Sequence, residues 1–276
     1  MEFSNKTSLN LVIGYPLHHT LSPLLHNEIY QKLNFNTVLL AAAHENLTAL
    51  IEASKTLKVG LIAVTMPFKK AILAYLDEIS EEVKTLGAAN TIIIKENKLS
   101  GYNTDVNGIM YAFRNIQLKN KKVLILGAGG AARAAAYVLK KAESEIYWYN
   151  RTTAHLTEVM HLFKGHALSF NQLAEETFDI IINTTPVGMY PDINDSPIPA
   201  SLLHEELVVF DMVYNPRKTE LLKQADQKGA IIISGLEMFV AQALKQIELW
   251  KQINFSEDFH LTMQEKLAAH FEQDKT

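Results

Sequence analysis

The stretch "VLILGAGGAARAAAYVL", residues Val123–Leu139, decides how this chain of 276 residues folds. Apolar residues precede a glycine turn and an alanine-rich run follows it, which predicts the order strand, tight turn and helix. Gly127, Gly129 and Ala132 match the pattern G-x-G-x-x-G/A. In this context the pattern predicts that backbone N–H groups at the helix N-terminus hold a dinucleotide pyrophosphate. A tight turn that binds nothing is the less favoured alternative.

The end of the next predicted strand, "IYWYNRTTAH" (146–155), indicates which dinucleotide binds. An NAD enzyme usually has Asp or Glu there, which accepts a hydrogen bond from the ribose 2′-OH. Here Asn150, Arg151 and Thr152 occupy that place. Arg151 can pair with a 2′-phosphate, which an acidic residue would repel. We therefore predict NADP rather than NAD, the alternative being that Arg151 is a solvated surface residue.

Short apolar runs alternate with helical patterns on both sides of this stretch, which predicts βαβ units and an α/β fold. The predicted strands are Leu9–Ile13, Val38–Ala43, Leu61–Thr65, Val123–Leu126, Ile146–Tyr149, Ile180–Asn183, Val208–Asp211 and Ile231–Ser234, with a hairpin formed by Thr91–Lys95 and Lys98–Tyr102. The predicted helices are Pro23–Leu33, Glu45–Leu57, Lys70–Leu76, Ala131–Lys141, Gly235–Ile253 and Glu257–Phe271. A helix within Asn107–Asn120 is expected to separate two α/β blocks, with a ligand cleft between them.

Composition excludes several classes of protein. The net charge is −4 and no Lys/Arg block stands out, so nucleic acid is not expected as a partner. Cysteine is absent, which rules out disulfides and cysteine-ligated metals. The N-terminus does not resemble a signal peptide and no stretch suits a membrane span. We expect a cytoplasmic protein.

Polar residues follow or precede several predicted strands of the first block. "VTMPFK" contributes Thr65 and Lys69, "GAANT" contributes Asn90, and "GYNTDVNG" contributes Asp105. Since ligands of open α/β sheets bind at the carboxyl ends of strands, these side chains are expected to converge. Together with a dinucleotide they suit alcohol–carbonyl interconversion, with Lys69 as the acid/base. Asp105 would hold Lys69 but also raise its pKa, and a purely structural pair, or no pair, is the alternative.

The stretch "GYPLHHTLSPLLHN" (14–27) precedes and opens the first predicted helix. Thr20 and Ser22 offer hydroxyl groups beside a helix N-terminus, which predicts a cradle for a carboxylate. Ser22 is also expected to be the N-cap, followed by Pro23 at the first helical position. The three histidines His18, His19 and His26 lack a metal-ligand spacing, and no metal site is predicted. The long polar loop Pro186–Pro199 is a further candidate for function.

These segments resemble the shikimate dehydrogenase family from Gly14 to Gln242. The resemblance rests on motifs in the family's order: "GYPLHHTLSP", "VTMPFK", "GAANT", "GYNTDVNG", "GAGGAARA", "NRT", "NTTPVGM", "DMVYNPRKTELL" and "GLEMFVAQA". It implies NADPH-dependent reduction of 3-dehydroshikimate to shikimate in aromatic amino-acid biosynthesis, by a monomer or homodimer. It also implies an N-terminal α/β substrate domain with a mostly parallel sheet (1–106 and 238–276) and a Rossmann NADP-binding domain (107–237). The C-terminal helices would return to the first domain.

The resemblance assigns roles to individual residues. Lys69 with Asp105 would be catalytic. The substrate would be held by Thr20, Ser22, Thr65, Lys69, Asn90, Asp105, Tyr214 and Gln242. The cofactor would be held by Gly127, Ala128, Gly129, Gly130, Ala131, Asn150, Arg151, Thr152, His155, Thr184, Met212 and Gly235.

Four positions depart from the usual family pattern. Thr20 stands where Ser is usual, and its extra methyl is expected to shift selectivity. Ala63 replaces an Asn, which removes one supporting hydrogen bond. His155 replaces a basic residue, so the NADP preference is expected to weaken as pH rises. Thr184 replaces an Ala near the nicotinamide.

Three other functions stay open. Thr20 permits a dual quinate/shikimate dehydrogenase. A non-catalytic module that senses NADPH and substrate is disfavoured by the intact Lys69 and Asp105. A folate-type dehydrogenase of related plan is disfavoured by the Thr20 and Ser22 hydroxyls.

Overall fold

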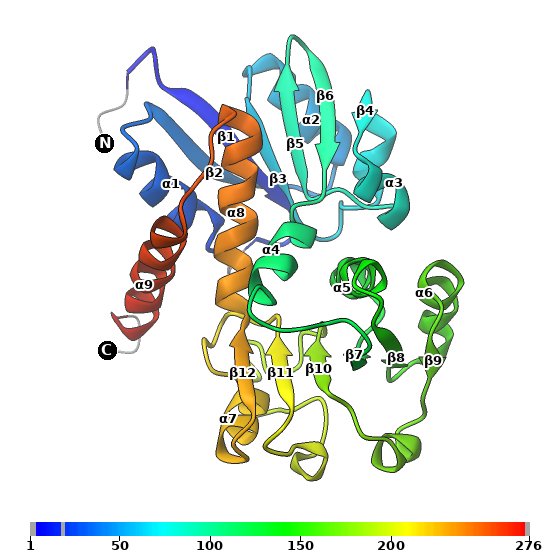
Figure 1. The fold of residues 1–276 in the computed structure, drawn as a ribbon. Coiled ribbons are helices and arrows are strands. Elements are labelled where there is room, and N and C mark those ends of the chain that lie inside the picture. The colour runs from blue at the N-terminus through cyan, green and yellow to red at the C-terminus, as the bar shows by residue number, and fades with distance from the viewer. Residues whose placement is uncertain (1–3, 18–19, 274–276) are drawn as a thin grey trace. The chain divides into compact units, whose positions relative to one another are not determined.

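The computed structural model describes residues 4–17 and 20–273, and the chain divides into two compact units (Figure 1). Unit 1 comprises Met1–Thr104 and Val240–Leu267, and unit 2 comprises Asp105–Phe239 and Ala268–Thr276. Each unit contains one six-stranded sheet. The predicted α/β fold with two blocks is therefore confirmed. Val240–Leu267 returns to unit 1 as expected, whereas the residues from Ala268 onwards group with unit 2.

The sheet of unit 1 has the order β2-β1-β3-β5-β6-β4. Its strands are β1 (Ser8–Gly14), β2 (Thr37–Ala43), β3 (Leu61–Val64), β4 (Glu78–Ile79), β5 (Thr91–Lys95) and β6 (Lys98–Tyr102). The pairs β1–β2, β1–β3 and β4–β6 are parallel, whereas β3–β5 and β5–β6 are antiparallel. The hairpin prediction is confirmed, because Glu96 and Asn97 both have positive φ, as a two-residue hairpin turn requires.

Helices connect these strands and close the unit. They are α1 (Ser22–Lys32), α2 (Leu47–Thr56), η1 (Ala71–Tyr75) and α3 (Glu81–Leu86), followed late in the chain by α8 (Gly235–Lys251) and α9 (Glu257–Gln273). The predicted helix Lys70–Leu76 is instead a short 3-10 helix, Ala71–Tyr75. The sequence reading missed α3, although Gly87 ends it in the left-handed conformation typical of a helix C-terminus.

Unit 2 contains an all-parallel sheet in the order β12-β11-β10-β7-β8-β9. Its strands are β7 (Lys122–Leu126), β8 (Glu145–Tyr149), β9 (His166–Ala167), β10 (Ile180–Asn183), β11 (Val208–Asp211) and β12 (Ile231–Ser234). Its helices are α4 (Asp105–Ala112), α5 (Gly130–Lys141), η2 (Thr153–His155), α6 (Leu156–Phe163), η3 (Asn171–Glu175), η4 (Ala200–Leu202) and α7 (Glu220–Gln227). The central strands are buried on both faces, which explains their uninterrupted apolar sequences.

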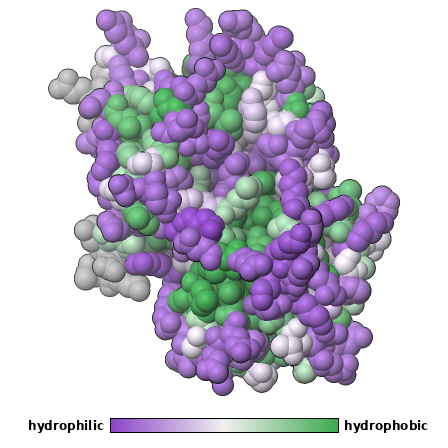
Figure 2. Space-filling view, viewed as in Figure 1, coloured by the Kyte–Doolittle hydropathy of each residue, from purple (hydrophilic) through white to green (hydrophobic). Residues whose placement is uncertain are grey.

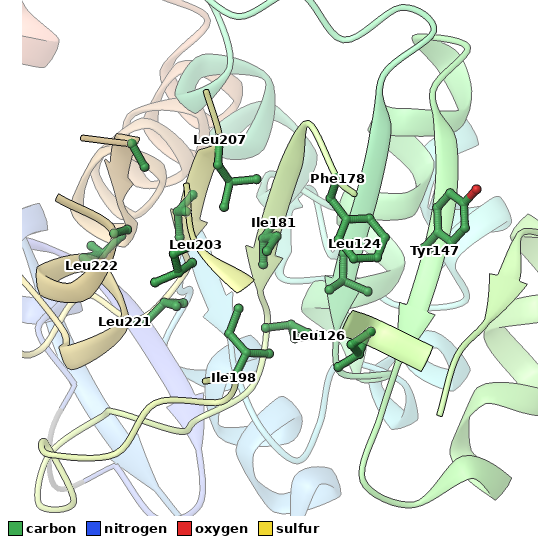
Figure 3. Packing of buried hydrophobic residues seen from close by; sticks show 14 of the residues in the cluster. Leu124, Leu126, Tyr147, Phe178, Ile181, Ile198, Leu203, Leu207, Leu221 and Leu222 are labelled. Atoms are coloured by element: carbon green, nitrogen blue, oxygen red, sulfur yellow. The ribbon is translucent and has the colours of Figure 1, made fainter. Parts of the chain in front are cut away.

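The hydrophobic core of unit 2 lies along this sheet. Leu124 and Ile181 contribute from neighbouring strands, and Leu221 and Leu222 contribute from α7 (Figure 3). Val209 on β11 belongs to the same core. A separate core in unit 1 fixes the ends of its strands in the same way. These two cores place the loops at the carboxyl ends of the strands, where the predicted site residues lie.

Hydrophilic residues cover most of the face seen in Figure 2, and hydrophobic residues are exposed over part of unit 2. Ile231, at the start of β12, is more than half exposed. Among the described residues, no helix combines the length and apolar character needed to cross a membrane.

Candidate active site

The glycine turn of unit 2 has the geometry of a phosphate cradle. Gly127 has φ +110°, and an added Cβ there would lie 2.6 Å from the hydroxyl oxygen of Thr184, which itself donates a hydrogen bond to Leu126 O at 2.6 Å. At Gly129 and Gly130 an added Cβ would meet no atom within 4 Å. The N-terminus of α5 therefore has open space beside it, and the residues present fit an anionic pyrophosphate.

The loop after β8 presents a cationic side chain. The amide of Asn150 donates to Thr152 O at 2.7 Å and closes the loop on itself. Arg151 is exposed. His155 is exposed in η2, a short distance along the chain. The guanidinium of Arg151 is thus accessible to a 2′-phosphate, which fits NADP.

A buried carboxylate fixes the loop after β11. Asp211 accepts hydrogen bonds from Asn183 Nδ2 (2.9 Å), Val213 N (3.0 Å) and the Thr219 hydroxyl (2.6 Å). Burial raises the pKa of Asp211 to about 6, and these three donors partly oppose that rise. Sequence reasoning missed this cluster, although Asp211 and Asn183 each end a predicted strand and so carried a detectable signal.

The residues predicted for the nicotinamide end lie on loops held by that carboxylate. Met212 directly follows Asp211 and is half-buried. An added Cβ at Gly235 would overlap the Met212 carbonyl group, so Gly235 allows α8 to begin against this peptide. Tyr214 stacks on Phe239 with ring centroids 4.4 Å apart, and burial raises its pKa. The structure therefore brings Met212 and Gly235 together. The ring of Tyr214 packs against Phe239, which also belongs to unit 2.

The predicted carboxylate cradle lies at the N-terminus of α1 in unit 1. The helix starts at Ser22 with Leu21 as its N-cap, and no side chain makes a capping hydrogen bond. The expected N-cap role of Ser22 is therefore wrong. Instead, Ser22 N donates to the Thr20 hydroxyl at 3.4 Å, and the Ser22 hydroxyl bonds to nothing in the described part of the chain. This buried hydroxyl is therefore available to bind a ligand.

Two loops of unit 1 meet beside β3. The Lys69 carbonyl accepts a hydrogen bond from Ala89 N at 2.9 Å, and Val64 N donates to Asn90 O at 2.7 Å. Thr65 directly follows β3 and is half-buried, as is Lys69. The predicted residues Thr65, Lys69 and Asn90 are thus held on hydrogen-bonded neighbouring segments.

The side chain of Asn90 belongs to a buried polar cluster. Its Oδ1 accepts from Thr104 N (2.7 Å) and from the Thr91 hydroxyl (2.7 Å), and its Nδ2 donates to the Thr104 hydroxyl (3.1 Å). The oxygen is saturated, so a ligand would meet the NH₂ group. Thr91 and Thr104 were not predicted, because nothing in their local sequence distinguishes them from ordinary strand and loop residues.

The two proposed catalytic residues fall on either side of the division between the units. Lys69 belongs to unit 1, and the buried Asp105 is the first residue of unit 2 and of α4. Their pairing stays a prediction. Gln242 lies buried on α8 within unit 1. Ala63, which stands where the family usually has Asn, is a buried residue of β3.

The histidines of the opening stretch differ in what the structure describes. His18 and His19 lie outside the described residues. His26 is fully buried, with Nδ1 2.9 Å from Ser22 O and Nε2 3.0 Å from Gln246 Oε1. Within residues 4–17 and 20–273, no three His, Cys, Asp or Glu residues gather as metal ligands would.

Two family models match the chain. The model described as the shikimate dehydrogenase substrate binding domain matches residues 12–92, and the model described as shikimate / quinate 5-dehydrogenase matches residues 111–233. Together they cover parts of both units.

Curated proteins and solved structures agree with these matches. A shikimate dehydrogenase (NADP(+)) of Carboxydothermus hydrogenoformans is 37% identical over 266 residues, covering 92% of this chain and 95% of its own. A crystal structure of shikimate dehydrogenase in complex with NADP+ has a TM-score of 0.88 and 34% identity, covering 97% of this chain and 98% of that one. The Thermus thermophilus enzyme in complex with NADP(H) and shikimate has a TM-score of 0.84 and 32% identity, covering 94% and 99%.

Proposed function

The chain belongs to the shikimate dehydrogenase family, and from that premise we propose that it catalyses the reversible NADPH-dependent reduction of 3-dehydroshikimate to shikimate in aromatic amino-acid biosynthesis. The observation that carries the proposal is the meeting of the Thr65, Lys69 and Asn90 segments beside β3. These three side chains offer a hydroxyl, an ammonium and an amide, which suit the ring hydroxyls of a polyhydroxy acid.

The open glycine turn and Arg151 fit NADP, which supplies the hydride donor and acceptor when bound. In our proposal the backbone N–H groups from Gly127 to Ala131 hold the pyrophosphate, and Arg151 pairs with the 2′-phosphate. The Asp211 cluster fixes the loop that carries Met212, so this side chain can limit access of water to the reacting carbon.

Residues of the substrate site bind, orient and exchange a proton. The hydroxyls of Thr20 and Ser22 hold the substrate carboxylate at the N-terminus of α1. The Asn90 amide donates to a ring hydroxyl. Lys69 gives a proton to the carbonyl oxygen during reduction and removes it from the alcohol during oxidation, and Asp105 orients the ammonium. Tyr214 and Gln242 complete the proposed contacts.

A second candidate is dual use of shikimate and quinate. The description of one matching family model names both shikimate and quinate. Thr20 also alters the carboxylate cradle, where a change of substrate would arise. We also propose that the enzyme works in the cytoplasm as a monomer or homodimer, which fractionation of cells and sedimentation of the purified protein would test.

The test is NADPH formation followed at 340 nm with purified protein and NADP+. Shikimate and quinate are compared as substrates, and NAD+ is run in parallel. We expect turnover of shikimate with NADP+ strongly favoured. Comparable turnover of quinate would support the second candidate, and no turnover of either despite tight NADPH binding would indicate a sensing module.

A further inference from the structure

A chain of buried hydrogen bonds runs through unit 1 from the first turn of α1 to Asn90. His26 contacts Ser22 O through Nδ1 (2.9 Å) and the Gln246 amide through Nε2 (3.0 Å). The other end of the Gln246 amide lies 3.0 Å from the Thr91 hydroxyl, which lies 2.7 Å from Asn90 Oδ1. The chain therefore joins α1, α8 and β5, which are far apart in the sequence.

The interior members of this chain are shielded from water. His26 and Thr91 are 0% exposed, and Gln246 is 2% exposed. Because no water can replace a missing partner there, each polar group depends on the neighbour that it has. A change at one member is expected to displace the next rather than to be absorbed by solvent.

The protons of the chain can be assigned from donor and acceptor chemistry. Gln246 Nε2 donates to the Thr91 hydroxyl, which in turn donates to Asn90 Oδ1. Burial lowers the pKa of His26 to about 4, so the ring is neutral at pH 7 and carries one N–H. Ser22 O and Gln246 Oε1 both accept, so the tautomer of His26 decides which of them receives that N–H.

In that neutral state the chain stays continuous through Thr104. Asn90 Nδ2 donates to the Thr104 hydroxyl (3.1 Å), and the Thr104 and Thr91 hydroxyls lie 3.2 Å apart. The links from Gln246 through Thr91 therefore all donate towards Asn90.

Both ends of the chain belong to groups assigned above to substrate. Ser22 opens α1 beside the Thr20 hydroxyl, and Asn90 presents its amide beside β3. We propose that His26 and Gln246 are positioning residues, which set the separation between the carboxylate cradle and the Asn90 amide. This inference rests on the proposed function. Neither residue touches substrate, and both act through the residues at the ends of the chain.

The experiment compares Gln246→Met with Thr91→Val, which keeps the branched shape but removes the hydroxyl. Steady-state rates are measured with shikimate and NADP+, each varied separately. We expect the KM for shikimate to rise about tenfold in both variants, with the KM for NADP+ unchanged, since a lost buried hydrogen bond has about this effect. Thr91→Ser restores the hydroxyl and is expected to restore the KM.

The matched control is Tyr30→Phe, which removes another buried hydrogen bond of α1, between Asn10 Nδ2 and the Tyr30 hydroxyl (2.8 Å). It is expected to lower Tm as much as Gln246→Met but to change the KM for shikimate less than about twofold. An unchanged KM in Gln246→Met, or an equal rise in Tyr30→Phe, would overturn the inference while leaving the proposed function intact. No shikimate turnover by the wild type would remove the proposed function and this inference with it.

Discussion

The buried polar groups of the two units are organised in opposite ways. In unit 1 a chain of neutral groups passes from Asn90 through Gln246 to His26, each member bonding to the next. In unit 2 three donors converge on one carboxylate, Asp211. A chain relates the positions of two distant loops, whereas a convergent cluster holds a single loop in place. The difference matches the proposed division of labour, in which unit 1 must fit both ends of a substrate and unit 2 must keep a cofactor loop still.

Lys69→Ala tests that division most strongly. Because general acid–base catalysis contributes about 10²–10⁴-fold, we expect kcat to fall about 10³-fold while NADPH binding stays almost unchanged. Turnover at 340 nm and a fluorescence titration of NADPH measure the two quantities. If the variant kept most of its activity, the mechanism assigned to unit 1 would be wrong.

The pH dependence of stability separates the two networks by sign. The pKa of His26 is lowered to about 4, so the unfolded chain binds its proton first as pH falls from 6.5 to 4, and unit 1 loses about 3 kcal/mol. The pKa of Asp211 is raised to about 6, so the native state binds its proton first as pH falls from 6 to 3.8, and unit 2 gains about 3 kcal/mol.

Urea unfolding of His26→Asn and Asp211→Asn over this pH range measures both contributions. Relative to wild type, the His26 variant is expected to become less destabilised as pH falls, and the Asp211 variant more destabilised. If stability depended on pH in the same way in the wild type and in both variants, the opposite pKa shifts of His26 and Asp211 would be contradicted.

Arg151→Ala acts on unit 2 alone. A charge-assisted hydrogen bond contributes about 2 kcal/mol, so we expect the KM for NADP+ to rise about thirtyfold, with little change in the KM for shikimate or for NAD+. Thr153→Ala, a nearby exposed position with no assigned role, provides the control. An equal loss with NADP+ and NAD+ would mean that Arg151 does not contact the 2′-phosphate.

Thr20→Ser gives the smallest expected effect and refines the role of unit 1. Removing one methyl from a pocket changes selectivity by about 1 kcal/mol, and Thr20 is the departure from the usual Ser that permits the use of quinate. We expect the ratio of quinate to shikimate kcat/KM to fall about fivefold. A ratio that stays constant would show that Thr20 does not line the cradle.

Sequence patterns predicted the elements whose residues carry their own signal. Ile180–Asn183 and Val208–Asp211 form the predicted strands because both faces are buried, which leaves an apolar run. The patterns failed where tertiary structure decides. β4 and β9 contain two residues each, too few for any periodicity. The N-cap depends on the backbone angles of Leu21, not on the presence of Ser22.

The site residues also divide into those with a local sequence signal and those that only tertiary packing brings together. Glycines and strand-end polar groups are local signals, so Gly127, Arg151 and Lys69 were identified as candidates. The partnership of His26 and Gln246 spans 220 positions, and although His26 lies in a distinctive stretch, no local pattern pairs it with Gln246. Only the packing of α8 against α1 brings the two side chains together.

The short strands β4 and β9 have a consequence for self-association. Each closes one edge of its sheet with two residues, which leaves few unpaired backbone groups for another chain to extend. The opposite edges are β2, with seven residues, and β12, with four. Strand-to-strand aggregation of partly unfolded molecules is therefore expected to begin at β2 or β12, and a lysine placed at Leu40 or Ile231 would suppress it.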